Sequence, residues 1–255
     1  MIVFRCDCRI VASVDPSMKT LGIIGGLGPE STIDYYRALV SRYREKMGSG
    51  YPSLVIVSLD VDKAIDMLNS KRLEDLADYL LGGIRQLAAA GADVGLMSAN
   101  SPHIVFDSLH ANSPIPLISI VEAACDEVQR HNLIRVGLLG TRFTMSGRFY
   151  QDVFNRREVS LVAPSEEEQA RIHEKYINEL LIGKFLPETR GFLEQMISNL
   201  KDRDGVQGVV LAGTELPLIL RAESIAGLPL FDTTQIHVSA AVSEILEGKE
   251  AGHGV

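Results

Sequence analysis

"GADVGLMSANSP", residues 91–102, and "GVQGVVLAGTEL", residues 205–216, repeat one pattern. In each, an apolar run of the kind found in buried β-strands ends in small polar residues. After a helix-length gap, each leads to a Pro-Leu run, a polar turn and a second helical stretch, "IPLISIVEAACDEV" from Ile115 and "LPLFDTTQIHVSAAVSEI" from Leu228. The repetition predicts one α/β unit that occurs twice in the chain.

The rest of the chain from Met18 alternates in the same way. Short β-rich runs predict strands at Leu21–Ile24, Leu54–Leu59, Val94–Ser98, Leu117–Ile120, Val136–Leu139, Leu161–Ala163, Val209–Ala212 and Leu230–Phe231. Apolar positions at helical spacing predict helices at Ser31–Met47, Leu73–Ala90, Val121–His131, Glu166–Ile182, Pro187–Lys201 and Gln235–Glu247. Ser165 with Glu168 predicts a capping box, and Gly183 a left-handed helix end.

This alternation is typical of parallel sheets covered by helices. We therefore expect an α/β fold of two similar, Rossmann-like lobes with parallel sheets, related by duplication. Residues 18–117 plus 230–255 are expected to form the first lobe, and residues 118–229 the second.

The composition is that of a globular protein and argues against several partners. Of 255 residues, 46% are hydrophobic and 23% charged, and the net charge is −8. Because phosphate binding needs clustered Lys and Arg, which the sequence lacks, we expect no nucleic-acid partner and no anionic membrane surface. No apolar run approaches the roughly 20 residues of a membrane span.

Three cysteines, Cys6, Cys8 and Cys125, match neither a disulfide framework nor a two-pair zinc pattern, so a reduced cytoplasm is expected. Residues 1–17 lack the features of a signal peptide, and a domain-like beginning follows at Met18. We interpret this leader as an over-called upstream start or a disordered tail.

The two polar stretches predict a ligand site. Ligands of open parallel sheets bind outside the carboxyl ends of the strands, so two facing lobes would hold a small ligand between them. Asn100, Ser101 and Thr214, with the adjacent backbone amides, would present hydrogen-bond donors at helix starts, which suits a carboxylate. The alternative is that these residues only cap helices and form turns.

Five stretches together carry a family resemblance: "MKTLGIIGGLGPESTIDYYRALV", "ANSPHIVFDSL", "VGLLGTRFTM", "QARIHEKYINELLIG" and "GTELPLIL". From Met18 to about Glu247, the chain resembles the aspartate/glutamate racemases, which invert an α-carbon without pyridoxal phosphate. The resemblance implies two α/β lobes with the active site between them, no cofactor, no metal, an amino acid or other small carboxylate as substrate, and commonly a homodimer.

Removal of an α-hydrogen requires a base on one face, a proton donor on the other and donors for the carboxylate. Family members typically use two cysteines for the proton transfers. The resemblance places these thiols at Ala99 and Gly213, neither of which can transfer a proton. It therefore implies a mechanism without two thiols, or an engineered removal of both. Cys125 lies within a predicted amphipathic helix and is interpreted as a small core residue.

Other residues are candidates for the proton transfers. Glu215 is the first, because a carboxyl buried in a cleft can have its pKa raised toward neutrality. His103 occupies the position of the family's histidine and can donate to a ligand. Structural roles remain alternatives for both residues. A zinc site formed by His103, His173 and Glu215 is a further alternative, although we expect no metal.

Binding residues are expected at three further places. Thr141 and Thr144 can supply hydroxyl donors at a third strand end, or cap a helix. Lys63 and Arg171 are the basic residues nearest to the positions at which the family holds a distal carboxylate. Because neither matches the family pattern in full, a substrate other than aspartate or glutamate is credible.

Three functions follow. The first is racemisation or epimerisation of a small carboxylate without pyridoxal phosphate. The second is a lyase or isomerase step that needs enolate stabilisation but not two thiols. The third is a non-catalytic protein that keeps only the carboxylate site.

Overall fold

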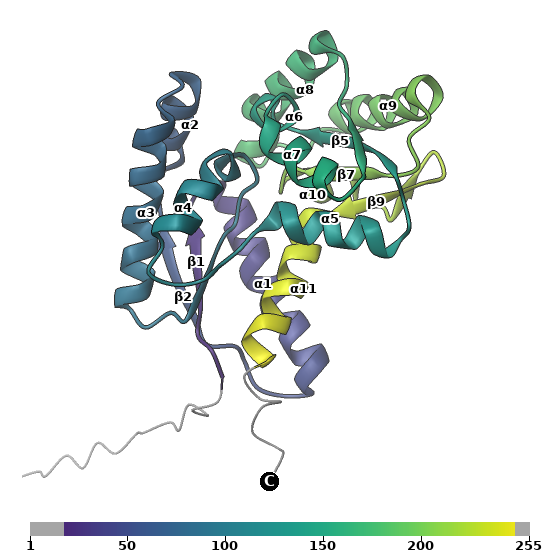
Figure 1. Cartoon of the computed structure of the whole chain (residues 1–255). Coiled ribbons are helices and arrows are strands. Elements are labelled where there is room, and N and C mark those ends of the chain that lie inside the picture. Colours follow the sequence, from purple (N-terminus) through teal and green to yellow (C-terminus); the bar gives the residue numbers. More distant parts are fainter. Residues whose placement is uncertain (1–17, 248–255) are drawn as a thin grey trace, which may run out of the picture.

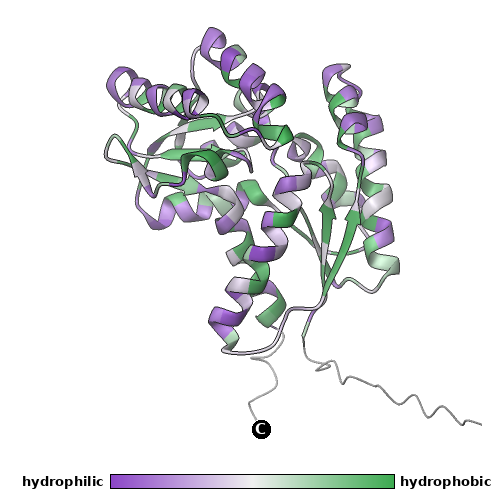
Figure 2. Ribbon diagram, turned by 180° about the vertical axis from the view of Figure 1, so that it is seen from behind, coloured by the Kyte–Doolittle hydropathy of each residue, from purple (hydrophilic) through white to green (hydrophobic). Residues whose placement is uncertain are grey.

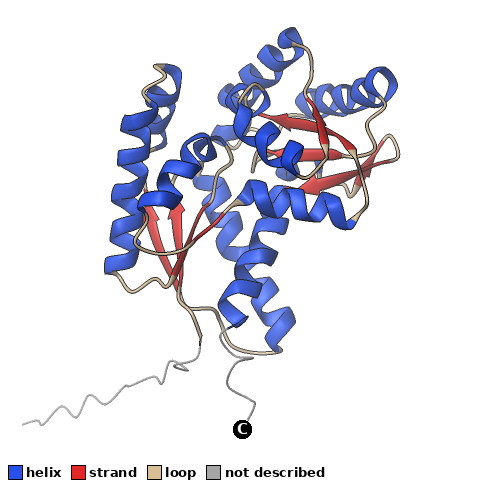
Figure 3. Cartoon of the chain, in the orientation of Figure 1, coloured by secondary structure: helices blue, strands red, loops and turns tan. Residues whose placement is uncertain are grey.

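The computed structural model describes residues 18–247, so the predicted leader with Cys6 and Cys8 lies outside the described residues. Two groups of strands, each with its own helices, form two lobes (Figure 1, Figure 3). Within residues 18–247, no helix is both long enough and apolar enough to cross a membrane.

The first lobe is built on a parallel sheet of order β2-β1-β3-β4. Its strands are β1 (Leu21–Gly25), β2 (Leu54–Ser58), β3 (Val94–Met97) and β4 (Leu117–Ile118). Its helices are α1 (Pro29–Met47), α2 (Val61–Asn69), α3 (Leu73–Ala89), the 3₁₀ helix η1 (Ser101–Val105) and α4 (Phe106–Asn112). The central strands β1 and β3 are buried along their whole length, as expected for a sheet covered on both faces.

The second lobe repeats this topology. Its four parallel strands have the order β6-β5-β7-β9, and β8 pairs antiparallel with β9. The strands are β5 (Arg135–Gly140), β6 (Ser160–Val162), β7 (Val209–Ala212), β8 (Ser224–Ile225) and β9 (Leu228–Asp232). The helices are α6 (Arg142–Met145), α7 (Arg148–Arg156), α8 (Glu166–Asn178), η2 (Leu180–Ile182), α9 (Pro187–Asp204) and α10 (Leu216–Leu220). The predicted α/β fold of two similar lobes with parallel sheets is confirmed.

The chain changes lobe at two helices: α5 (Ile120–Arg130) follows β4 and packs in the core of the second lobe, and α11 (Thr233–Leu246) follows β9 and packs in the core of the first. Helix α11 packs against α1 and α5 and contributes Val238 and Val242 to the core beneath β1 (Figure 1). The predicted lobe boundaries, after residues 117 and 229, each fall within a strand, because β4 ends at Ile118 and β9 continues to Asp232.

The strands are the most hydrophobic part of each lobe, and the helices turn polar faces to solvent (Figure 2). A glycine turn after β1 brings the chain into the region between the lobes. Gly26 has a φ of 78°, and a Cβ there would lie 2.2 Å from the carbonyl oxygen of Leu59. Only glycine fits this turn, which leads to Leu27 and the start of α1.

Two local predictions are confirmed. Ser165 and Glu168 form a capping box at the start of α8, and Gly183 ends η2 in the left-handed conformation. Helices α2 and α7 and strand β8 were not among the predicted elements.

Candidate functional site

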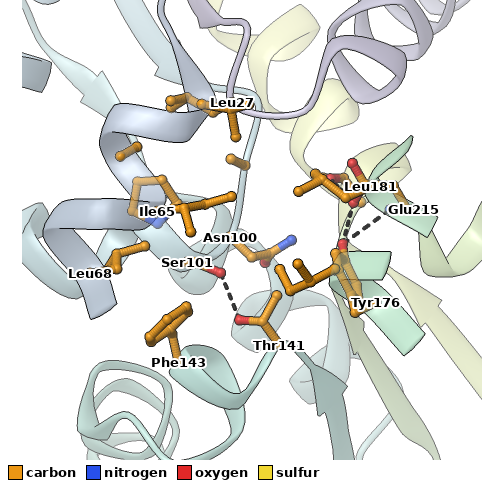
Figure 4. Close-up of a pocket in the computed structure, with 17 residues that line it drawn as sticks. Leu27, Ile65, Leu68, Asn100, Ser101, Thr141, Phe143, Tyr176, Leu181 and Glu215 are labelled. Atoms are coloured by element: carbon orange, nitrogen blue, oxygen red, sulfur yellow. Dashed lines mark hydrogen bonds between the residues drawn. The ribbon is translucent and has the colours of Figure 1, made fainter. Parts of the chain in front are cut away.

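A cavity of about 50 Å³ lies between the two lobes, beyond the carboxyl ends of β1, β3, β5 and β7 (Figure 4). Because about 10–15 Å³ of such volume is enough to hold one water, the cavity is large enough to hold more than a single water molecule. The lining residues are Leu27, Val61, Ala64, Ile65, Leu68, Ala99, Asn100, Ser101, Pro102, Thr141, Phe143, Tyr176, Ile177, Leu181, Gly213, Thr214 and Glu215. Both repeated stretches therefore contribute to one cavity.

Hydroxyl groups from the two lobes meet at one end of the cavity. Ser101 Oγ lies 2.8 Å from Thr141 Oγ1 and 3.3 Å from Thr144 Oγ1 (Figure 4). Thr141 also accepts from the backbone N–H of Thr144 and caps α6. Ser101 and Thr141 line the cavity, whereas Thr144 is fully buried behind them. The two roles expected for the threonines, capping and presenting hydroxyls, are thus compatible.

Asn100 is held by both ends of its amide. Its oxygen accepts from the Tyr150 hydroxyl at 2.6 Å, and its nitrogen donates to Thr233 Oγ1 at 3.2 Å. An amide nitrogen carries two N–H groups, so a second donor remains at the cavity. The side chain is therefore fixed in place by the protein before any ligand arrives.

Glu215 and Tyr176 form a buried pair on the side of the second lobe. The Tyr176 hydroxyl donates to Glu215 Oε2, which also accepts from Thr214 Oγ1 at 3.0 Å (Figure 4). Glu215 Oε1 is buried without a hydrogen-bond partner. Burial raises the pKa of Glu215, and the bonds from Tyr176 and Thr214 oppose this shift.

Because Gly213 has no side chain, the ring of Tyr176 can occupy the space beside it. A Cβ on Gly213 would lie 2.6 Å from Tyr176 Cε2 and 2.8 Å from the phenolic oxygen, both too close for a real side chain. Across the cavity, Ala99 presents a methyl group. The two positions to which the resemblance assigns thiols therefore line one cavity, and the second is filled from α8.

The histidines lie elsewhere. His103 is buried behind the cavity, where its Nδ1 donates to the Ala99 carbonyl and its Nε2 accepts from the Ile120 N–H. His173 accepts at Nδ1 from the Arg142 N–H, and neither histidine lines the cavity. Among the described residues, no group of three or more His, Cys, Asp or Glu side chains could hold a metal ion.

The two basic residues expected to hold a distal carboxylate also lie outside the cavity. Lys63 is 64% exposed and lies 4.0 Å from Asp60, while Arg171 stacks on the ring of Phe192. The same helix α2 that carries Lys63 turns Val61, Ala64, Ile65 and Leu68 toward the cavity. Of the described residues that line it, none is basic and Glu215 alone is acidic.

Tyr176 and the apolar face of α2 are the parts of the site that sequence reasoning missed. Tyr176 stands four residues after Ile172 and four before Leu180, on the buried face of its helix. That spacing is typical of a core residue. Among the signals in the sequence, only the glycine at position 213, far along the chain, indicates that there is space for the ring of Tyr176.

The fold and the site define a two-lobed α/β protein with a ligand cavity between its lobes. The sequence pattern of the Asp/Glu/Hydantoin racemase family matches residues 24–241. The chain belongs to this family.

Solved structures agree with this assignment. A candidate Asp/Glu racemase from Yersinia pestis is 30% identical, with a TM-score of 0.81 over 90% of this chain and 100% of that chain. An aspartate racemase homologue from Pyrococcus horikoshii is 31% identical, with a TM-score of 0.76 over 90% and 100% of the two chains. A glutamate racemase from Francisella tularensis, at 14% identity, shares the fold with a TM-score of 0.62 over 94% and 85% of the chains.

Proposed function

We propose that the chain moves the α-proton of a small carboxylate that carries an apolar substituent, without pyridoxal phosphate or a pair of thiols. The observation that carries this proposal is the division of the cavity. Hydroxyl and amide donors from Asn100, Ser101 and Thr141 gather around the strand ends, and much of the rest of the wall is apolar, formed by α2 together with Leu27, Phe143, Ile177 and Leu181.

The division of the cavity into a polar and an apolar part determines which class of substrate it binds. The donors suit one carboxylate, because hydroxyl and amide N–H groups hydrogen-bond its oxygens. A second carboxylate would lie among Ile65, Leu68 and Leu181 with no cation beside it. Burying an unpaired charge costs several kcal/mol, so aspartate and glutamate are poor ligands compared with apolar amino acids of similar size.

The cavity supports proton transfer at one face of the substrate. Full inversion needs a proton carrier on each face of the substrate. The Ala99 side of the cavity offers a methyl group, while the Gly213 side offers the Tyr176–Glu215 pair. The reaction that these groups support is exchange of the α-hydrogen of one enantiomer with retention, with slow racemisation or epimerisation.

Proton exchange in deuterium oxide tests the proposal. D- and L-forms of alanine, valine, leucine, aspartate and glutamate are incubated with the protein, and the α-proton signal and the chirality are followed. We expect exchange with retention for an apolar amino acid, at least tenfold faster than for either acidic one. Exchange confined to aspartate or glutamate would overturn the substrate class.

A lyase or isomerase step is the second candidate, favoured by the same absence of a carrier at Ala99. Ligands that raise the melting temperature yet show no exchange would favour that candidate or a non-catalytic carboxylate-binding protein. The homodimer implied by the family resemblance is part of this proposal, and sedimentation velocity tests it.

A further inference from the structure

Tyr176 occupies a place that the backbone at Gly213 opens for it. Its ring comes from α8 and reaches the end of β7, where a Cβ on residue 213 would meet the ring at 2.6 Å and the hydroxyl oxygen at 2.8 Å. The phenolic oxygen therefore lies directly beside the space that a side chain of residue 213 would occupy. Tyr176 is 4% exposed, and it lines the cavity.

The hydroxyl is oriented on two sides. It donates to Glu215 Oε2 and accepts from the Glu215 backbone N–H at 3.4 Å. Thr214 Oγ1 donates to the same carboxylate oxygen, which fixes the carboxyl group against the phenol. A phenol that donates to a carboxylate has a more basic oxygen than a free phenol, because the hydrogen bond shifts electron density onto it.

The carboxyl group behind the phenol can take a proton. Oε1 of Glu215 has no partner, and it lies 2.6 Å from where a Cβ on Gly28 would be, at the start of α1. Burial raises the pKa of both Glu215 and Tyr176, so the pair disfavours a phenolate beside a carboxylate. A proton that reaches Tyr176 therefore displaces the phenol's own proton toward Glu215.

We propose that Tyr176 is the catalytic proton carrier of this site and that Glu215 is the positioning carboxylate behind it. The phenolic oxygen accepts the α-hydrogen while its own proton moves to Glu215 Oε2, and the electron pair of the broken C–H bond enters the substrate's enolate. The protons held by Tyr176 and Glu215 then exchange with solvent, and a hydron returns from the same phenolic oxygen to the same face of the α-carbon, so deuterium enters the substrate and the configuration is retained. The inference rests on the proposed function and names the group that performs it.

The test compares three variants of the full chain in the exchange assay, with the apolar amino acid that exchanges fastest. Tyr176→Phe keeps the ring and removes the hydroxyl, and we expect a loss of exchange of about 100-fold or more, because general acid–base groups contribute at least this much. Tyr51→Phe is the matched control, at an exposed tyrosine outside the cavity, and we expect its exchange to stay within twofold.

Glu215→Gln separates positioning from packing. It keeps a hydrogen-bonding group beside the phenol but cannot accept the phenolic proton. In the wild type, exchange should slow as the pH falls through the raised pKa of Glu215. In the variant, exchange should be at least tenfold slower, and that dependence should be lost.

The outcomes are distinct. Exchange in Tyr176→Phe within threefold of the wild type would overturn the assignment of Tyr176. If that variant did not fold, a Glu215→Gln protein with wild-type rate and wild-type pH dependence would overturn it instead. Absence of exchange in the wild type with every ligand that stabilises it would overturn the proposed function, and the proton carrier with it.

Discussion

Position 213 shows how one residue type determines the contents of the site. Glycine is present there because the ring of Tyr176 fills the space of a side chain. The two residues lie in different elements, so the relation between them exists only in the folded protein. Substitutions at either position should therefore depend on the other.

The first prediction concerns this dependence. Gly213→Ala should lower the free energy of unfolding by about 1–3 kcal/mol, because the new methyl group forces the ring to shift. In a Tyr176→Ala background the same substitution should cost much less, and the difference is the coupling energy that a double-mutant cycle in urea measures.

Gly191→Ala is the control for this cycle. It lies within α9, where an added Cβ meets no atom within 4 Å, so we expect a gain of about 0.5–1 kcal/mol from helix propensity. Equal costs of Gly213→Ala in both backgrounds would mean that the ring does not occupy this space.

The second prediction concerns thiol chemistry. Cys125 is buried in α5 within a core formed by residues such as Val128 and Val136, and burial raises the pKa of its thiol to about 11. Because the thiolate is the reactive form, iodoacetamide at pH 7.5 should neither modify Cys125 in the folded protein nor change ligand binding or exchange. Mass spectrometry of the treated protein checks the modification. Alkylation of Cys125 that a ligand prevents would contradict its place in the core.

At this scale, the sequence predicts those residues of the cleft whose place follows from a local pattern, and it does not predict those whose place depends on distant contacts. Asn100, Ser101, Thr214 and Glu215 were identified because a strand end followed by a polar residue is a local pattern. Tyr176 was not identified, because its contact with residue 213 joins segments that are distant in the sequence. The place of His103 in the motif likewise does not predict the two backbone groups that hydrogen-bond to its ring.

Helix α2 is the element that sets the character of the cavity. Asp60 caps it by accepting from the N–H of Asp62, and its apolar face borders the cavity while Lys63 faces solvent. Short helices of this kind are difficult to predict, because two turns give few repeats of the apolar spacing. The longer helices α1, α3, α8 and α9 were predicted within a few residues for the converse reason.

The third prediction uses this helix to change selectivity. Ile65→Lys places an ammonium group in the apolar wall, where it can pair with a distal carboxylate. We expect binding of aspartate or glutamate to improve at least tenfold relative to leucine, as measured by calorimetry. Lys63→Ala, on the solvent face of the same helix, should leave both affinities within twofold. Unchanged affinities for both ligands in a folded Ile65→Lys variant would show that α2 does not contact the substrate.

At the scale of the whole molecule, the cavity exists because two lobes approach each other. Ser101 of the first lobe meets Thr141 of the second, and Glu215 of the second lobe reaches Gly28 at the start of α1. A ligand between them contacts both lobes, so it adds to contacts that the protein already makes across the cleft. Below these contacts, α11 packs beside both lobes and carries the buried His237 and, at its N-cap, the partly buried Asp232.

His237, Asp232 and the nearby His103 make stability depend on pH. His237 accepts at Nδ1 from the Tyr35 hydroxyl and donates at Nε2 to the Ile118 carbonyl, and burial lowers its pKa to about 4. Burial and the neighbouring His237 lower the pKa of His103 to about 3. Burial raises the pKa of Asp232, the N-cap of α11, to about 6.

The signs of these shifts oppose one another. The histidines stabilise the fold above pH 6.5, their unfolded value, and this contribution is lost as the pH falls toward 4. Asp232 stabilises the fold below 3.8, its unfolded value, and this contribution is lost as the pH rises through about 6. Near pH 5, unfolding therefore binds two protons at the histidines and releases one at Asp232, so these groups give a slope of about 1.4 kcal/mol per pH unit.

The last prediction is that Asp232→Asn steepens this slope. Asparagine also caps helices well, so α11 should remain intact while the opposing proton is removed. We expect the free energy of unfolding, measured in urea between pH 6 and 4.5, to fall with decreasing pH by about 2.4 kcal/mol per pH unit in the variant and by about 1.4 kcal/mol per pH unit in the wild type. Equal slopes would mean that Asp232 is ionised in the folded protein, and a wild-type stability that rises as the pH falls would mean that the histidines are not held neutral.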